Sequence, residues 1–282
     1  MSTVEVTATA PAPAAPRARR QIRVGRLILP AYTWLVIAYT VVPILVMVAY
    51  SFNVAPTGRL TFHWNGFTTQ WYSQVFDIGD LTNALEHSLE IAFASTAIAV
   101  ALGTPLAIAM ARHRFFGRGA TDAVVFTDIA APSVVVGASL LSLFITLNVP
   151  RGLVTILIAH VTFNVAFVVI VVRARVLGLD RSIEKAAADL GAGPWTAFQK
   201  VTLPLIFPGI VAAALLAFAM SIDDFIITSF VAGQTLTFPL WVYGAVKVGI
   251  PPQVFVMGTL IFVGGIMLAI ANAVFQRSAS NS

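Results

Sequence analysis

The sequence predicts an all-α membrane protein with six transmembrane helices and a long cytoplasmic loop between helices 4 and 5. Two observations lead to this class: 58% of the residues are apolar and only 10% are charged, and the mean hydropathy is +0.88. A water-soluble domain of 282 residues with this composition would expose large apolar patches. The bilayer is therefore the expected solvent.

Six apolar runs approach the roughly 20 residues that a helix needs to cross the hydrocarbon core. Each run is expected to be an α-helix, because a helix satisfies its own backbone polar groups in lipid. The first run is longer than the apolar core of a typical signal peptide and lacks a small-residue cleavage site, so we expect a retained anchor. In chain order the runs cover residues 27–52, 85–111, 123–147, 153–172, 205–222 and 254–275.

The chain divides into a tail at 1–25 and a transmembrane domain at 26–282. The tail is rich in Ala, Pro, Thr and Arg and cannot bury a core, so it is expected to be a disordered basic cytoplasmic segment. Lys and Arg mark the cytoplasmic side of a membrane protein. With both termini inside, fourteen of the 17 basic residues are cytoplasmic, and Arg59, Arg151 and Lys247 are outside. Because this charge is spread over juxtamembrane segments, no nucleic-acid partner is expected.

The sequence offers no catalytic residue and no metal ligand set. It contains no Cys, which removes disulfides and thiol chemistry, and its four His residues do not have metal-ligand spacing. A phosphate-binding Gly-rich loop with Lys and a nucleophile triad are both missing from the pattern. The chain is therefore expected not to be an enzyme.

The loop at 173–203 is longer than most connections, and such loops are often functional. Asp180 or Ser182 is expected to cap a short helix with one apolar stripe, and Gly191 suits its left-handed end. Pro194 suits the first turn of a second short helix. The stripe is Ile183, Ala186, Ala187 and Leu190, and the second helix carries Trp195, Phe198 and Val201 on one face. This pattern fits either a docking module or an amphipathic elbow on the lipid surface.

The same loop resembles the EAA motif of ABC importer permeases. Gly191 aligns with the motif glycine, Ala186 and Ala187 fill the Ala-Ala positions, and residues 201–204 supply the apolar-x-Leu-Pro ending. One departure is plain, because Lys185 occupies the Glu position and Glu184 stands one residue earlier. A shift of one residue turns a helical side chain by about 100°. The usual salt-bridging partner on the ATPase would then be reached from a different angle or not at all.

The resemblance extends over nearly the whole chain beyond the tail and is closest to spermidine/putrescine-type permeases. Matching stretches include 50–53, 87–89, 160–164, 221–225 and 238–243. A second departure follows Pro132, where the polyamine branch tends to carry an acidic residue and this chain has Ser133. Asp128 lies one turn earlier. Related permeases for phosphonate, opine, ferric iron and thiamine share much of the framework and are alternative assignments.

The resemblance implies a permease subunit that forms half of the translocation pathway of an ATP-driven importer in the bacterial inner membrane. It implies a second permease subunit (a homologue or a second copy), two ATPase subunits that bind ATP and Mg²⁺, and an extracytoplasmic solute-binding protein. This chain itself would need no cofactor. The coupling helix and its surroundings would contact the ATPase through Glu184, Lys185, Ala186, Ala187, Asp189, Gly191, Trp195, Phe198 and Pro204.

A substrate pathway is expected around the acidic residues of the membrane spans, because a membrane carboxylate is costly and by default suggests function. Asp128, Asp223 and Asp224 would attract a polycation, although the last two could also form a helix-terminating or inter-subunit pair. Phe163, Trp241 and Tyr243 would line the path through cation–π contacts. His160 and Asn164, which share a helical face, are expected either to join helices or to face the pathway.

Two other classes compete with this assignment. A stand-alone secondary transporter would normally show internal repeats and broken helices around a midplane ion site, and no clear repeat is present. A membrane-embedded enzyme would need a cluster of catalytic His and Asp residues within the spans. Six spans with a docking loop fit a subunit better than a complete carrier.

Overall fold

A computed structural model describes residues 25–60 and 63–281 of the chain. These residues form helices joined by loops, and the predicted all-α membrane architecture is confirmed. Within residues 25–60 and 63–281, five helices are long and apolar enough to cross a membrane, or six spans if one sharply bent pair counts as a span. Nearly all of the predicted disordered tail, residues 1–24, lies outside the described residues.

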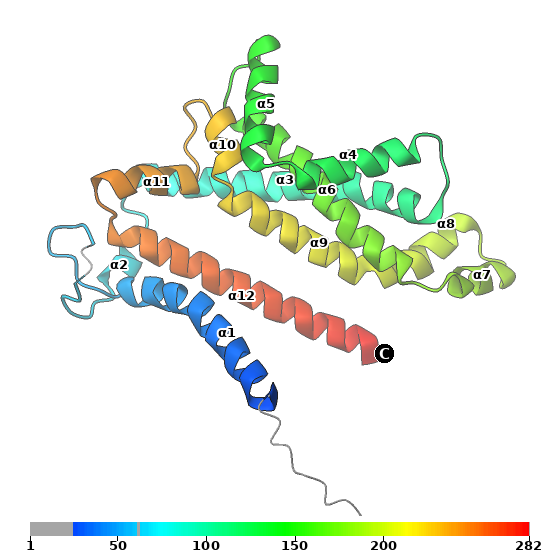
Figure 1. Ribbon diagram of the computed structural model, residues 1–282, viewed down its shortest axis with the longest axis horizontal. Coiled ribbons are helices and arrows are strands. Elements are labelled where there is room, and N and C mark those ends of the chain that lie inside the picture. Colours follow the sequence, from blue (N-terminus) through cyan, green and yellow to red (C-terminus); the bar gives the residue numbers. More distant parts are fainter. Residues whose placement is uncertain (1–24, 61–62, 282) are drawn as a thin grey trace, which may run out of the picture. The chain divides into compact units, whose positions relative to one another are not determined.

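The chain divides into two compact units between Val46 and Met47. The first unit contains most of α1 (Gly25–Tyr50), which has Pro30 and Pro43 within its length and includes a candidate span at Ile28–Tyr50. All other helices belong to the second unit, which contains every site described below (Figure 1).

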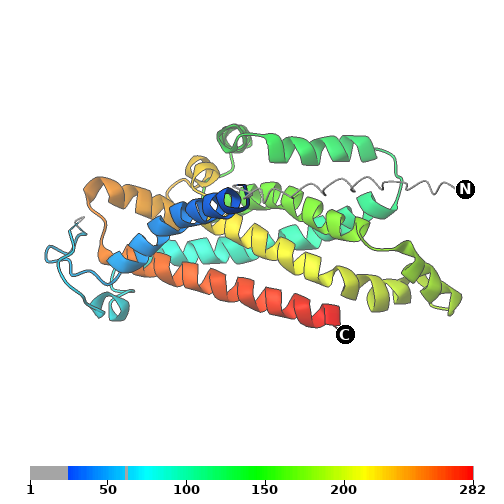
Figure 2. The ribbon, with the colours of Figure 1, turned by 60° about the horizontal axis from the view of Figure 1, so that its bottom comes forward.

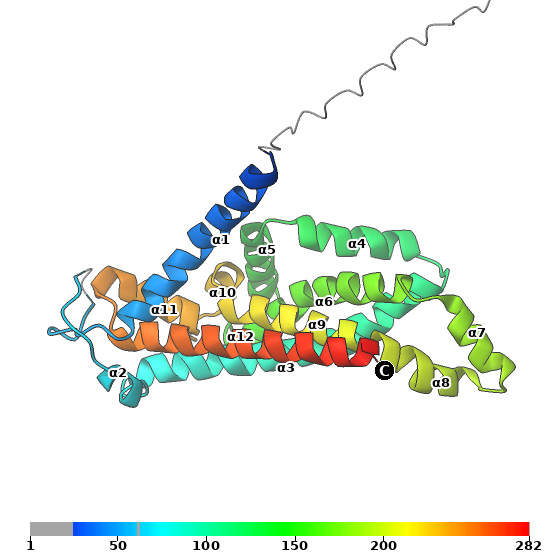
Figure 3. The same ribbon diagram turned by 90° about the horizontal axis from the view of Figure 1, so that it is seen from below.

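The second unit contains three long central helices, the long helix α12, a bent pair and several short helices. The bounds are α2 (Gln70–Ser73), α3 (Gly79–Arg112), α4 (Arg118–Ala130), α5 (Ser133–Thr146), α6 (Leu153–Leu177), α7 (Arg181–Asp189), α8 (Pro194–Ala197), the π-helical turn η1 (Phe198–Thr202), α9 (Leu203–Asp223), α10 (Ile226–Val231), α11 (Phe238–Val248) and α12 (Pro252–Asn281). Figures 1 and 3 show α7 and α8 at one end of the long helices, and α2 and α11 at the other end.

The core of this unit forms where α3, α6 and α9 pack together. Small and β-branched side chains dominate it, so the helix backbones approach closely, as is common in membrane bundles. Gly103 on α3 is the clearest case: a Cβ added there would lie 2.8 Å from Cγ1 of Val168 on α6. In Figure 2 these three helices run side by side along the length of the bundle.

The third predicted span, 123–147, is broken in the structure. Helices α4 and α5 meet at an angle of 110°, and the break falls at Ala131 and Pro132. Proline has no N–H to continue the helical ladder, and it pushes the preceding residue into an extended conformation, which Ala131 adopts. Beyond the bend, α5 packs against α10, where a Cβ on Gly137 would lie 2.6 Å from the Phe230 ring. The bend therefore places α5 against α10.

Candidate functional site

The loop between α6 and α9 folds as two short helices whose ends are fixed by local hydrogen bonds. The Asp180 side chain accepts a hydrogen bond of 2.8 Å from the Ser182 backbone N–H, and so caps α7. This bond holds the pKa of the Asp180 carboxyl below its ordinary value. At the other end, Gly191 has φ +84° and its N–H donates to Ala188 O at 2.9 Å. The predicted cap and the predicted left-handed end are both confirmed.

The outer surface of this loop carries large apolar side chains in the open. Leu190 is 90% exposed and Trp195 is 67% exposed, and the Trp195 ring stacks on Phe198 with centroids 5.5 Å apart. Apolar groups gathered on a protruding loop indicate a surface that another molecule covers. Nearby, Lys185, Ala186, Asp189, Gly191 and Pro204 are exposed, while Ala187 and Phe198 are half-buried.

Glu184 and Lys185 point in different directions. Lys185 is exposed, whereas the Glu184 carboxylate turns back toward the bundle. Its Oε1 accepts from Nη2 of Arg112 at 3.1 Å and from the Thr202 hydroxyl at 3.1 Å. Arg112 is the last residue of α3, and Thr202 immediately precedes α9. One carboxylate oxygen therefore joins α7 to the ends of two core helices.

Toward the other end of the bundle lies an open cavity of about 570 Å³ with acidic and aromatic walls. Three carboxylates reach it, from Asp128 on α4, Asp223 at the end of α9, and Asp224 just beyond. In the part of the chain that the structure describes, the buried Oδ2 of Asp128 has no hydrogen-bond partner. The remaining walls come mainly from Ile129, Ala131, Ser133, Val136, Phe163, Phe167, Met220, Phe225, Ile226 and Ile227.

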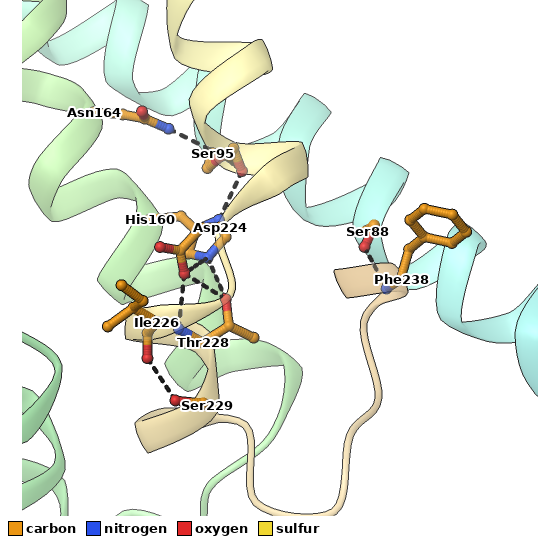
Figure 4. Close-up of polar contacts among 10 residues, drawn as sticks. Ser88, Ser95, His160, Asn164, Asp224, Ile226, Thr228, Ser229 and Phe238 are labelled. Atoms are coloured by element: carbon orange, nitrogen blue, oxygen red, sulfur yellow. Dashed lines mark hydrogen bonds and ion pairs between the residues drawn. The ribbon is translucent and has the colours of Figure 1, made fainter. Parts of the chain in front are cut away.

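Asp224 is held in place by the start of α10. Its Oδ2 accepts hydrogen bonds of 2.8 Å from both the backbone N–H and the hydroxyl of Thr228. Because that hydroxyl donates to Asp224, its oxygen accepts from Nε2 of His160, which lies 2.9 Å away. The same Nε2 is 3.6 Å from the Asp224 carboxylate (Figure 4).

A buried chain of polar side chains continues from His160 across the helix core. Its Nδ1 lies 2.7 Å from the Ser221 hydroxyl on α9, and that hydroxyl lies 3.0 Å from Ser95 on α3. Asn164, one turn along α6, donates to Ser95 at 3.5 Å (Figure 4). All of these side chains are buried, so this network of side chains joins α3, α6, α9 and α10 through polar contacts. His160 and Asn164 lie in this network, behind the residues that line the acidic cavity.

The two predicted pathway aromatics of α11 lie in different places. Tyr243 lines a second cavity of about 480 Å³, largely apolar, which shares Asp223 and Phe225 with the first. Its ring lies 4.7 Å from that of Phe225, and the Lys247 ammonium sits 4.9 Å above it. Trp241 instead lines a separate cavity with Arg59. Asp223 thus faces both cavities, and Trp241 faces neither.

The structure adds residues that the sequence pattern did not single out. Arg112 and Thr202 hold Glu184, while Ser95, Ser221 and Thr228 complete the buried network. Ser95 and Ser221 interrupt otherwise apolar runs, and Arg112 ends one, so the sequence alone could have drawn attention to these residues. It could not have predicted what they contact, because each contact joins segments far apart in sequence.

Comparison with known proteins gives a consistent class. Residues 103–281 match the family described as "Binding-protein-dependent transport system inner membrane component". The chain is 36% identical over 255 residues to the spermidine/putrescine transport system permease protein PotC of Escherichia coli (strain K12), covering 90% of this chain and 96% of that protein. It is 40% identical over 227 residues to the putrescine transport system permease protein PotI of the same organism, covering 78% of this chain and 80% of that protein.

The fold is also shared with solved importers. A bacterial ABC transporter that imports the acidic polysaccharide alginate contains a chain with a TM-score of 0.64 and 19% identity, covering 93% of this chain and 99% of that chain. The MetNI methionine ABC transporter gives a TM-score of 0.58 and 17% identity, covering 70% and 95%. At these identities the likeness concerns the fold alone.

The chain belongs to the family of binding-protein-dependent ABC transporter inner-membrane permeases. It is a multi-pass inner-membrane protein and the non-catalytic transmembrane subunit of an importer. It works in a complex with an ATPase, which handles ATP, and with a periplasmic binding protein. Assignment as a stand-alone carrier or a membrane-embedded enzyme is excluded by this membership.

Proposed function

We propose that this chain is the permease of a polyamine importer and that the acidic cavity is part of the substrate path. One observation carries the proposal: three carboxylates and three phenylalanine rings share the wall of one open cavity within a membrane bundle. The relatives named for spermidine and putrescine transport support the same substrate class.

The chemistry of the cavity fits a flexible chain of ammonium groups. Each ammonium can pair with a carboxylate, and the methylene segments between them can lie against aromatic rings, which also attract cations. The unpaired Oδ2 of Asp128 favours a cationic ligand, because a buried carboxylate without a partner is costly. Asp223 is exposed to both cavities and is the proposed main contact.

The other candidate residues take supporting roles in this proposal. Asp224 already accepts two hydrogen bonds from Thr228, so it contributes negative potential more than a free contact. His160 and Asn164 would hold that carboxylate and the helices behind it. Phe163 and Tyr243 would line the two connected cavities, and Trp241, which lines another cavity, would meet substrate only outside them.

The alternative substrate classes differ in charge. Phosphonate is anionic and would be repelled by three carboxylates, so the cavity argues against it. Carboxylates are also ligands of ferric iron, which would compete for the same groups, although the phenylalanine rings provide it with no ligand. Thiamine carries one fixed positive charge and opines carry carboxylates of their own, so both match the negative cavity less well than a chain with two or more ammonium groups.

We further infer how the complex is assembled. The exposed face of the loop at 173–203 would dock on one of two ATPase subunits, and a second permease would complete the pathway. Because fourteen of the 17 basic residues then fall on the ATPase side, both termini would be cytoplasmic. The proposed domain at 26–282 is thus one functional unit, with 1–25 as a basic tail.

The test is uptake of labelled spermidine and putrescine by the assembled complex in proteoliposomes. Asp223→Asn is expected to raise KM about tenfold or more, since removing one partner of a desolvated charge pair is costly. Asp128→Asn should act in the same direction. The matched control is Glu86→Gln, which neutralises an exposed carboxylate of α3 away from the cavity and should leave KM unchanged.

Two results would contradict the polyamine assignment. One is an assembled, ATP-hydrolysing complex that takes up neither spermidine nor putrescine. The other is uptake with the same KM in Asp223→Asn, Asp128→Asn and Glu86→Gln. Uptake of ferric iron that is lost in Asp223→Asn and unaffected by excess spermidine would move the same cavity to a metal substrate.

A further inference from the structure

The ion pair between the coupling loop and the bundle suggests a role for one residue within the loop. Glu184 is the only carboxylate of α7 that faces inward, since Asp189 is exposed. Its side chain is 32% exposed, and its Oε1 already accepts from both Arg112 and Thr202. Both donors bind the same oxygen, so the carboxylate is held facing the bundle by its own chain.

The two donors lie at the loop ends of α3 and α9, and α9 lines the acidic cavity at its far end through Met220 and Asp223. Arg112 ends α3, which carries Ser95 about 25 Å further back at a rise of roughly 1.5 Å per residue. Thr202 leads into α9, which ends in Ser221, Ile222 and Asp223. Ser95 and Ser221 are hydrogen-bonded to each other at 3.0 Å. Thus α3 and α9 are tied together twice, by Glu184 at the loop end and by the two serines near the cavity.

Between these two points of contact, tight packing makes α3 and α9 move as one rigid unit. The contact of α3 and α9 with α6 is lined by side chains with almost no exposure, among them Ala107, Val172 and Ala213. Packed interiors of this kind transmit a displacement rather than absorb it. A movement of α7 would therefore displace α3 and α9 together and reach the cavity through α9.

We propose that Glu184 is the positioning residue of the loop, which passes a displacement of α7 to α3 and α9 and through them to the acidic cavity. It is distinct from the exposed residues of the loop, such as Leu190 and Trp195, which would contact the ATPase. The proposal rests on the docking role inferred above for the loop at 173–203, and it is independent of which substrate is carried.

The test compares coupling with assembly in the complete complex, reconstituted with its ATPase, partner permease and binding protein. In Glu184→Gln, the ATPase should co-purify at the normal ratio. Spermidine transported per ATP hydrolysed should fall about fivefold to tenfold, within the usual range of coupling between two sites. Stimulation of ATP hydrolysis by the binding protein should fall in parallel, which reports coupling even if spermidine is not the substrate.

Matched variants separate a positioning role from a general loss of structure. Thr202→Val removes one donor at almost constant volume and should lower the coupling ratio by about twofold to threefold, whereas Thr202→Ser should retain it. Thr69→Val makes the same change at an exposed position just before α2, at the other end of the bundle, and should have no effect. The double variant Arg112→Gln with Glu184→Gln should be no worse than either single variant, because both remove one contact.

Three outcomes would overturn the inference. Loss of the ATPase from Glu184→Gln would make Glu184 a docking residue, and an unchanged coupling ratio in an assembled complex would leave it without the proposed role. Additive losses in the double variant would show that Arg112 and Glu184 act separately. Normal ATPase binding in Leu190→Ser, by contrast, would remove the docking role of the loop on which the inference rests.

Discussion

The two ends of α3 and α9 differ in how complete their contacts are. At the loop end, Leu190 and Trp195 are largely exposed and one ion pair ties the loop to the bundle. At the cavity end, His160 is 1% exposed and each of its ring nitrogens has a hydroxyl partner within the chain. The loop thus exposes the apolar side chains that we propose for docking, whereas the polar groups around His160 are bonded to one another within this chain.

This difference decides what a substitution does. At the loop, water can replace most lost contacts, and a partly exposed ion pair contributes little to stability. In the network, a removed partner leaves buried polar groups unpaired, and the cost is far larger than the bond itself. Variants of the loop should therefore affect assembly and coupling, and variants of the network should affect the fold of this chain.

The largest effect is expected for His160→Ala. Loss of two interhelical hydrogen bonds together with the cavity left by the ring should lower the free energy of unfolding by about 2–4 kcal/mol. Thermal unfolding of the purified chain in detergent measures this. His113→Ala, at an exposed position, is the control and should stay within about 0.5 kcal/mol. Equal melting temperatures for both variants would mean that the network does not hold the helices.

Leu190→Ser should have the next largest effect, and only on assembly. An exposed apolar anchor at the centre of an interface contributes about 2 kcal/mol, so binding of the ATPase should weaken roughly thirtyfold. Titration of the ATPase onto the purified permease measures the affinity. The melting temperature of the free chain should not change, and a large drop there would contradict the view that this side chain awaits a partner.

Gly191 separates two possible reasons for a glycine in the loop, namely its backbone conformation and the space around it. A Cβ at this position would meet nothing within 4 Å, yet φ is +84°. Gly191→Val should therefore cost about 1–2 kcal/mol in backbone strain and loosen the loop, while Gly191→Asn should cost much less. ATPase binding by the two variants is the measurement. If Asn proves as harmful as Val, then the docking groove, and not the backbone, requires glycine.

The smallest effect is expected at Asp180. Asp180→Ala removes the cap of α7 and should weaken ATPase binding slightly, whereas Asp180→Asn keeps a capping side chain and should match the parent. Because the folded-state pKa is lowered, the stabilisation is present above the ordinary pKa of Asp and is lost as the pH falls through the folded value. ATPase binding by the parent should thus be constant across neutral pH on account of this group. A marked change there that Asp180→Asn abolishes would contradict this assignment.

Sequence reasoning was strongest where a local rule applies. The Asp180 cap, the left-handed Gly191 and the start of α8 at Pro194 each follow from the conformation of one or two residues, and the structure confirms them. Apolar length likewise predicted the long helices, since a bilayer imposes that length regardless of neighbours. The bend at Pro132 was missed, because apolar length does not distinguish one straight helix from two helices joined at an angle.

Composition and span lengths by themselves determined that this chain is a multi-span membrane protein, and the resemblance of the loop at 173–203 to the EAA motif indicated an importer permease, because these properties depend on consecutive residues. Only the tertiary structure decided that Glu184 faces inward while Lys185 faces outward, and that Asp128 joins Asp223 in one cavity while Trp241 lies in another. The physical reason is that such contacts depend on which helix faces pack together, and packing is a property of the whole bundle.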